Sequence, residues 1–154
     1  MKEIFNELSK DYISGITFSG GDPLHENNLD EVLKLVHEFR ISFPEKTIWL
    51  YTGYKLELLS EEIYNGIKQI CTISHFYPIP NKNEFAENQV KRSEIIELCN
   101  VLVDGEYIDE QKDLSLKFRG SKNQRVIDVK QSLAQNKVVL GNIDRGGIGS
   151  TGVN

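Results

Sequence analysis

Two short apolar segments separated by one amphipathic helical stripe constrain the fold of this chain most. Residues 15–18 and 47–51 are β-favouring apolar runs, and turn residues end each of them. Asn28 and Glu31 between them have the spacing of a capping box at the start of a helix. Strand–helix–strand repetition of this kind predicts an α/β fold with a mainly parallel sheet. The apolar stripe of the helix repeats at spacings of three and four and consists of Leu29, Val32, Leu33, Val36 and Phe39.

The same alternation continues along the rest of the chain. Ligands of parallel sheets gather at the carboxyl ends of the strands, so binding residues are expected after Phe18, Tyr51 and Val103. The remaining predicted segments are the end of a helix at 2–10, a helix at 55–68, a strand candidate at 70–74, a polar loop at 78–88, a short helix at 93–100, a strand at 101–103 and weaker strands at 125–129 and 138–140.

Length and composition limit the class of protein. At 154 residues the chain fits one domain, and we divide it into a folded part at 1–140 and a flexible Gly-rich tail at 141–154. Its formal net charge of −5 argues against a general nucleic-acid binder. No apolar stretch approaches the roughly 18 residues of a membrane span, and the first residues lack the apolar core of a secretory signal. These features predict a cytoplasmic protein that binds neither nucleic acid nor membrane.

The two cysteines, Cys71 and Cys99, lie far apart in sequence, each in an apolar neighbourhood. We expect two small buried side chains in a reducing compartment, with a disulfide or a metal-binding pair as the alternatives. The chain has no Cys-x-x-Cys motif and no Cys/His cluster, so no metal ligands are predicted. The histidines are isolated and none is given a catalytic role; His37 is expected at the surface of a helix.

The segment from Gly20 to Pro23 follows a predicted strand and precedes a predicted helix. Two adjacent glycines allow a sharp turn and let a ligand approach the main chain closely. Exposed N–H groups at such a turn favour a carboxylate or a phosphate, and exposed carbonyl groups favour an ammonium. A plain tight turn is the alternative. Thr52-Gly53 and Asp104-Gly105 occupy equivalent places on later strands, and three such sites on one sheet edge favour a pocket. A plain turn is the alternative at each, and a hairpin turn is a further alternative at residues 103–107.

Four basic residues lie close together ahead of one of the weaker predicted strands: Lys117, Arg119, Lys122 and Arg125. A cluster of this kind can bind a phosphate or the acidic surface of a partner protein. A solvated basic loop is the alternative interpretation.

Four strings of residues resemble the activases of anaerobic ribonucleoside-triphosphate reductases, which are radical S-adenosylmethionine enzymes. They are GITFSGGDPL at 15–24, IWLYTGY at 48–54, VLVDG at 101–105, and DLSLKFRGS at 113–121, the last running on through NQRVID at 123–128. The likeness covers residues 1–140, and the last string is the most specific to the family.

The resemblance implies a fold and a set of site residues. The fold is a partial, open (β/α)6 barrel of the radical S-adenosylmethionine type. Thr52 and Asp104 are implied to lie near the pocket for S-adenosylmethionine, and Lys117, Arg119 and Arg125 are expected to bind the partner protein. The residues implied to line the site for the methionine end of S-adenosylmethionine are Ser19, Gly20, Gly21, Asp22 and Pro23.

The resemblance also implies an activity, cofactors and partners. In the family, a [4Fe–4S] cluster drives one-electron reductive cleavage of S-adenosylmethionine, and the 5′-deoxyadenosyl radical takes a hydrogen atom from a glycine of the reductase. The predicted function is therefore activation of the anaerobic reductase through a glycyl radical. The implied partners are the large subunit of that reductase and an electron donor such as flavodoxin.

One departure from the family pattern bears on this chemistry. The family carries a Cys-x3-Cys-x2-Cys loop before the Gly-Gly segment, and the chain has no such string. The first strand, the cluster loop and a helix are therefore expected to be absent, so that residues 15–18 form an open sheet edge and the chain alone holds no cluster. Residues 70–90 look like an insertion. The alternative functions are a non-catalytic S-adenosylmethionine- or reductase-binding module and, more generally, an α/β nucleotide binder.

Overall fold

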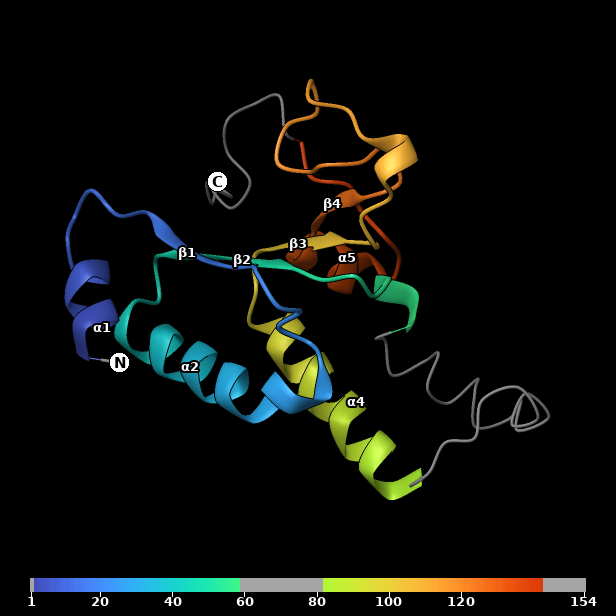
Figure 1. The fold of residues 1–154 in the computed structure, drawn as a ribbon. Coiled ribbons are helices and arrows are strands. Elements are labelled where there is room, and N and C mark those ends of the chain that lie inside the picture. The colour runs from blue at the N-terminus through green and yellow to red at the C-terminus, as the bar shows by residue number, and fades with distance from the viewer. Residues whose placement is uncertain (1, 59–81, 143–154) are drawn as a thin grey trace.

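The computed structural model describes residues 2–58 and 82–142, and these form an α/β fold, as predicted (Figure 1). The helix predicted at 55–68 is described only to residue 58, while the strand candidate 70–74, with Cys71, and residues 143–154 of the predicted tail lie outside the described residues. The elements are α1 (Lys2–Leu8), β1 (Gly15–Phe18), the 3-10 turn η1 (Glu26–Asn28), α2 (Leu29–Ser42), β2 (Thr47–Tyr51), η2 (Leu56–Leu58), α4 (Lys82–Glu97), β3 (Val101–Asp104), η4 (Asp109–Gln111), β4 (Arg125–Asp128) and α5 (Val129–Gln135).

The strands of the described residues form one open, mostly parallel sheet in the order β1-β2-β3-β4. β1 runs parallel to β2 and pairs Gly15 with Thr47, and β2 runs parallel to β3. β4 returns antiparallel to β3 and places Arg125 opposite Asp104. The helix α2 joins β1 to β2 and α4 precedes β3, as strand–helix–strand units require. β1 therefore lies at one edge of this sheet.

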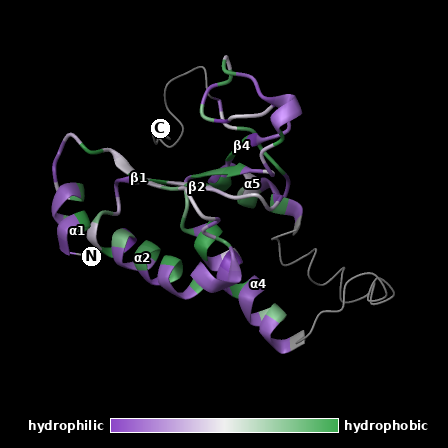
Figure 2. Ribbon diagram, in the orientation of Figure 1, coloured by the Kyte–Doolittle hydropathy of each residue, from purple (hydrophilic) through white to green (hydrophobic). Residues whose placement is uncertain are grey.

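The two faces of the sheet have different surroundings. α2 and α4 lie side by side on one face, and α5 packs against α4 (Figure 1). Ile48 and Leu50 of β2 are fully buried toward these helices, whereas Trp49 and Tyr51 alternate with them and are only partly buried. In Figure 2 hydrophobic colour lies along β2 and on the side of α2 that faces the sheet, and the outer side of α2 is hydrophilic.

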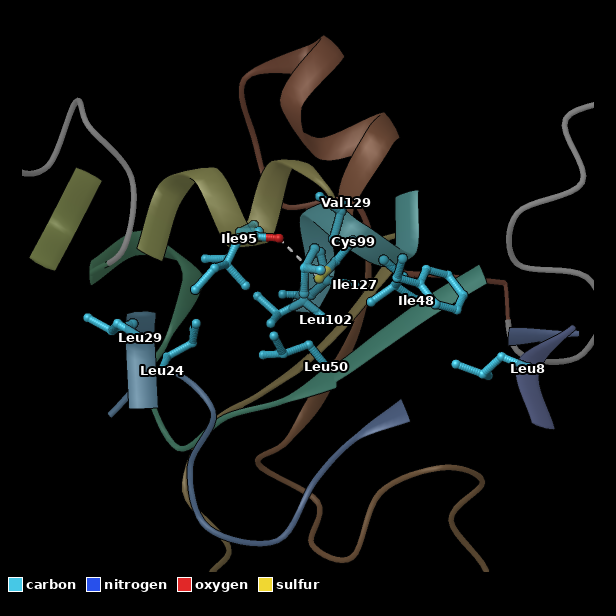
Figure 3. Close-up of a cluster of buried hydrophobic side chains, with 13 residues drawn as sticks. Leu8, Leu24, Leu29, Ile48, Leu50, Ile95, Cys99, Leu102, Ile127 and Val129 are labelled. Atoms are coloured by element: carbon cyan, nitrogen blue, oxygen red, sulfur yellow. Dashed lines mark hydrogen bonds between the residues drawn. The ribbon is translucent and has the colours of Figure 1, made fainter. Parts of the chain in front are cut away.

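The main core lies between the sheet and its helices (Figure 3). Each fully buried Leu, Ile or Phe side chain contributes about 1.5–3 kcal/mol through its removal from water, so this layer supplies most of the hydrophobic stabilisation. A smaller buried cluster on the opposite face joins β2, β3 and β4. The main core consists of Leu8, Leu24, Leu29, Val36, Phe39, Ile48, Leu50, Ile95, Ile96, Cys99, Leu102, Ile127 and Val129.

The helix α4 corrects two predictions. It begins at Lys82, so the loop predicted at 78–88 is wrong from that residue onward. The short helix predicted at 93–100 is only the last part of α4, which ends at Glu97. Polar side chains attach α4 to α2: Lys91 Nζ lies 2.5 Å from Asp30 Oδ1, and a 2.7 Å hydrogen bond joins Glu94 to the partly exposed His37. The first half of α4 is mostly polar and shows no apolar stripe, so hydrophobic periodicity does not detect it.

The entry to α2 also differs from the predicted capping box. Asn28 makes no side-chain capping bond; its Nδ2 instead donates to the carbonyl oxygen of Asp22 at 2.9 Å. His25 caps the preceding turn η1, where its Nδ1 accepts from the amide of Asn27 at 3.3 Å. The asparagine therefore holds the segment after β1 in place rather than capping the helix.

The C-terminal elements depart from the weaker strand predictions. The strand predicted at 125–129 ends at Asp128, whose carboxylate caps α5 by accepting from the amide of Gln131 at 2.9 Å. That helix was not predicted, because its short sequence shows no clear apolar stripe. The strand predicted at 138–140 contributes a single bridge, from Leu140 to Ile127. No helix in the described part of the chain is both long and apolar enough to cross a membrane.

Candidate functional site

The turn after β1 presents open backbone at the carboxyl edge of the sheet. Gly20 has a φ of +100°, a left-handed conformation that glycine adopts without strain. A Cβ placed on Gly20 or Gly21 would meet no atom within 4 Å, so the space beside both residues is open. Among the described residues, the backbone N–H groups of these two glycines have no hydrogen-bond partner. The turn therefore offers donors that a small anionic group can reach.

Asp22 ties this turn to the end of β2. Its Oδ1 accepts from the Thr52 hydroxyl at 2.9 Å and from the amide of Leu24 at 2.9 Å, and its Oδ2 accepts from the amide of Gly53 at 2.8 Å. Thr52 is buried, and its oxygen also accepts from the amide of Tyr54 at 3.2 Å. Since both side chains are engaged within the protein, they shape the turn and leave ligand binding to the main chain.

Asp104 forms a second carboxylate anchor at the end of β3. It is fully buried, and its Oδ2 accepts from the amide of Leu56 at 2.9 Å. Arg125 donates to it twice, from Nε at 2.9 Å and from Nη2 at 2.5 Å. The same guanidinium donates to both carboxylate oxygens of Glu57, at 2.8 and 2.7 Å. Arg125 thus bridges a buried and a partly exposed carboxylate, and this bidentate bond lowers the pKa of Glu57 to about 2.

The segment from residue 52 to 57 lies between these two anchors. Asp22 holds its first part through Thr52 and Gly53, and Asp104 holds its last part through Leu56. In between, the carbonyl oxygen of Tyr54 accepts from the amide of Gly105 at 3.2 Å. The ends of the three parallel strands are therefore joined directly, and the structure brings the 19–23 turn, Thr52 and Asp104 to one edge.

Arg92 supports this edge from α4, and sequence analysis did not single it out. The side chain is buried, its Nε donates to the carbonyl oxygen of Leu24 at 2.8 Å, and its guanidinium lies 5.1 Å from the ring centre of Tyr54. It therefore contacts both segments that follow β1 and β2. A buried arginine on a polar helix carries no sequence signal of this role, because both contacts are long-range.

The other basic residues predicted to bind a partner lie on the long connection from β3 to β4. Lys117 is exposed and Arg119 is partly buried, with its Nη1 donating to the carbonyl oxygen of Gln124 at 2.8 Å. The Nε of Arg119 is buried and has no partner among the described residues. Arg125 stands apart from both, at the sheet edge. The structure thus separates one predicted partner-binding residue from the other two.

A cleft of about 200 Å³ opens on the face of the sheet away from the main core. Phe118 covers one side of it: its ring centre lies 5.1 Å from that of Trp49, and its carbonyl oxygen accepts from the Tyr51 hydroxyl at 2.7 Å. Burial raises the pKa of Tyr51. The apolar run at 47–51 carries no sequence signal of this cleft. Its lining consists of Ser14, Gly15, Ile16, Thr17, Thr47, Trp49, Tyr51 and Phe118.

The described residues do not suit an iron–sulfur cluster. Such clusters are held by cysteine thiolates, and the chain has two cysteines. Cys99 is buried, its thiol donates to the carbonyl oxygen of Ile95 at 3.2 Å, and burial raises its pKa to about 12, which disfavours the thiolate. Within residues 2–58 and 82–142, no three His, Cys, Asp or Glu side chains are grouped to hold a metal ion.

Comparison with known proteins identifies the family. The family model described as a 4Fe-4S single cluster domain matches residues 1–127. The anaerobic ribonucleoside-triphosphate reductase-activating protein of Escherichia coli (strain K12) is 36% identical over 126 residues, which cover 80% of this chain and 63% of that protein. The protein of that name from Enterobacteria phage T4 is 35% identical over 128 residues, covering 82% of this chain and 60% of the phage protein.

The matches cover most of this chain but only part of its relatives. The chain spans about 60% of the length of these curated relatives. No solved structure matches the chain. The family model nevertheless covers more than half of the chain, in agreement with the resemblance seen in the four strings. The chain belongs to the radical S-adenosylmethionine family with the 4Fe-4S single cluster domain and is a homologue of the anaerobic ribonucleoside-triphosphate reductase-activating proteins.

Proposed function

We propose that this chain is the S-adenosylmethionine-binding and reductase-binding part of an anaerobic reductase activase. The complete activase would form a glycyl radical on the reductase after reductive cleavage of S-adenosylmethionine. The observation that supports this most directly is the open turn at Gly20 and Gly21, which the two carboxylate anchors hold at the carboxyl edge of a parallel sheet. Ligands of α/β proteins bind at that edge.

The main chain of the turn suits the methionine end of S-adenosylmethionine. The unpartnered N–H groups of Gly20 and Gly21 would donate to the ligand's carboxylate, and exposed carbonyl groups of the turn would accept from its ammonium. Asp22 and Thr52 would act as positioning residues, since their polar atoms already bond to one another and to nearby amides. Ser19 is exposed and Pro23 is buried at the two ends of this turn.

The proposed fold of the whole domain is the partial (β/α)6 barrel of the family. β1 lies at the edge of the described sheet, and the cleft beside it faces away from the helices, as the inner wall of an open barrel would. We also propose that residues 1–140 form this domain. The reductase, together with an electron donor such as flavodoxin, is the proposed partner.

The cysteines of this chain are not expected to hold the cluster, so we expect its ligands to come from elsewhere. The 154 residues contain only two cysteines, and the buried Cys99 donates its thiol hydrogen to the carbonyl oxygen of Ile95 in α4. We therefore expect that the chain alone, treated with iron and sulfide without oxygen, shows no stable cluster absorbance. A stoichiometric, chelator-resistant cluster would contradict this expectation. The same shortage of cysteines favours the second candidate, a module that binds S-adenosylmethionine or the reductase without radical chemistry.

Calorimetric titration of the purified chain with S-adenosylmethionine tests the proposed site. We expect measurable binding that is lost when Gly20 or Gly21 is replaced by Val. Gly21→Val is the more informative variant, because Gly21 lacks a positive φ and its added side chain would meet open space in the free protein. Ala134→Val on an exposed position of α5 is the matched control and should bind normally. A folded wild-type chain that binds no S-adenosylmethionine would count against the site.

A further inference from the structure

The connection from β3 to β4 carries an unusual distribution of charge. Residues 112–125 hold five of the chain's 18 Lys and Arg residues but only one of its 23 Asp and Glu residues. The chain as a whole is acidic, with a formal net charge of −5. Lys112, Lys117 and Lys122 of this stretch are exposed, and the ion pair between Lys122 and Asp113 is long at 3.8 Å. A local basic surface therefore stands on an acidic protein.

The same connection exposes large apolar side chains. Leu114 is 90% exposed, Phe118 is 54% exposed, and Tyr107 at the base of the loop is 47% exposed. A single exposed apolar residue needs no explanation, but several on one loop beside basic side chains are typical of an interaction site. In Figure 1 this loop projects from the side of the sheet opposite α2 and α4. No described helix covers it.

The tip of the loop is held in one conformation by its own contacts. Lys112 and Ser121 form a bridge at its base, and the amide of Asp113 donates to the carbonyl oxygen of Gly120 at 3.1 Å. Phe118 has a φ of +62°, which is unfavourable for a bulky side chain, and it is retained by Trp49 and by the Tyr51 hydroxyl. Maintaining a strained, exposed aromatic residue in an ordered loop is the pattern of a preorganised contact.

From these observations we infer that the loop at 112–122 is a docking surface for an acidic protein surface that accepts apolar side chains. Leu114 and Phe118 are the apolar anchors, and Lys117 and Lys122 supply charge complementarity at the rim. The inference rests on the proposed function, because the occupant is the surface of the anaerobic reductase. It adds two anchor residues that the charge pattern alone did not indicate, and it excludes Arg125, which is held by Asp104 and Glu57.

The test measures binding of the full chain to the anaerobic reductase encoded in the same genome, by calorimetry at low and high salt. We expect Leu114→Asp and Phe118→Asp each to weaken binding about tenfold or more, as loss of an interface anchor does. Lys122→Glu should weaken it about threefold at low salt and less at high salt. Ile41→Asp on α2, where the side chain is 82% exposed, and Lys130→Glu on α5 are the matched controls and should bind normally.

The outcomes separate this inference from the proposed function. Circular dichroism melting curves establish that each variant is folded, which is expected because the replaced side chains are exposed. If the wild-type chain binds the reductase and the loop variants bind equally well, the docking surface is wrong while the proposed partner stands. If the folded wild-type chain does not bind the reductase, the proposed partner and this docking surface both fail. Equal weakening by Ile41→Asp would also overturn the assignment to the loop.

Discussion

The two faces of the sheet use the same strands for different purposes. On the helical face, β2 contributes Ile48 and Leu50 to a core that excludes water. On the other face, the same strand contributes Trp49 and Tyr51, which line a cleft beneath the exposed Phe118. Neighbouring residues of a strand point to opposite faces of the sheet, so alternate side chains of β2 stabilise the core or remain partly accessible. On β2, the side chains that enter the main core and those that line the cleft therefore lie on opposite sides of the sheet.

The largest expected difference between the faces is in how much the free energy of unfolding falls when a phenylalanine is replaced by alanine. Phe39 of α2 is fully buried and packs on Phe43 with ring centres 5.5 Å apart, so Phe39→Ala should lower the free energy of unfolding by about 3–5 kcal/mol. Phe118→Ala removes a half-exposed ring and one aromatic contact, so it should cost about 1 kcal/mol or less. Urea denaturation of both variants checks this. Equal losses would contradict the division between the faces.

A second expectation concerns Arg125, which donates hydrogen bonds to the carboxylates of Asp104 and Glu57. Arg125→Met would leave Asp104 charged and buried without its counter-ion, at a cost of about 3 kcal/mol. Lys117→Met, at an exposed position on the neighbouring loop, is the matched control and should change the stability by about 0.5 kcal/mol or less. Thermal and urea unfolding give both values. A small loss for Arg125→Met would mean that water reaches Asp104 when its partner is removed.

This sheet edge also shows which parts of the candidate site can be predicted from the sequence. The rule that parallel strands end at one edge was enough to expect that the Gly20 turn, Thr52 and Asp104 lie together. The same rule could not predict the bond from Arg125 to Asp104, because that contact depends on β4 pairing antiparallel with β3 across a long connection. A charge count instead grouped Arg125 with Lys117 and Arg119.

The helices show the same limit. The apolar stripe of α2 was readable because its buried face repeats with the helical period. The first half of α4 was missed because its sequence is mostly polar and has no apolar stripe with the helical period. The aromatic cleft was missed for a related reason: the sequence does not reveal that one side of an apolar strand lacks a covering helix.

A third prediction compares the two neighbouring glycines of the turn. Gly20→Ala places a Cβ on a residue with a φ of +100° and should destabilise the fold by about 1–2 kcal/mol. Gly21→Ala adds a methyl group in open space without a positive φ and should change the stability by less than about 0.5 kcal/mol. Differential scanning calorimetry measures both. A reversed order would mean that the left-handed residue of the turn is misassigned.

The smallest expected effect is on the free energy of unfolding and comes from the ion pair between Arg125 and Glu57. This effect depends on pH. The pKa of Glu57 is lowered from 4.5 to about 2, mainly by its hydrogen bonds from Arg125. A lowered pKa means that the ion pair stabilises the fold fully above about pH 4.5 and that this contribution is lost as the pH falls through 2. Because Glu57 is 46% exposed, solvent screening limits the pair to about 0.5 kcal/mol.

Glu57→Gln tests this pair, since it keeps the shape of the side chain and removes its charge. The variant should be less stable than the wild type at pH 6, and the difference should shrink as the pH is lowered from 4.5 toward 2. Urea denaturation at several pH values measures it, with Glu38→Gln on α2 as a control for the loss of one negative charge. A difference that grows on acidification would show that Glu57 is not paired with Arg125 in solution. The guanidinium would then be bound on its buried side alone, which would leave its outer side open to an incoming carboxylate.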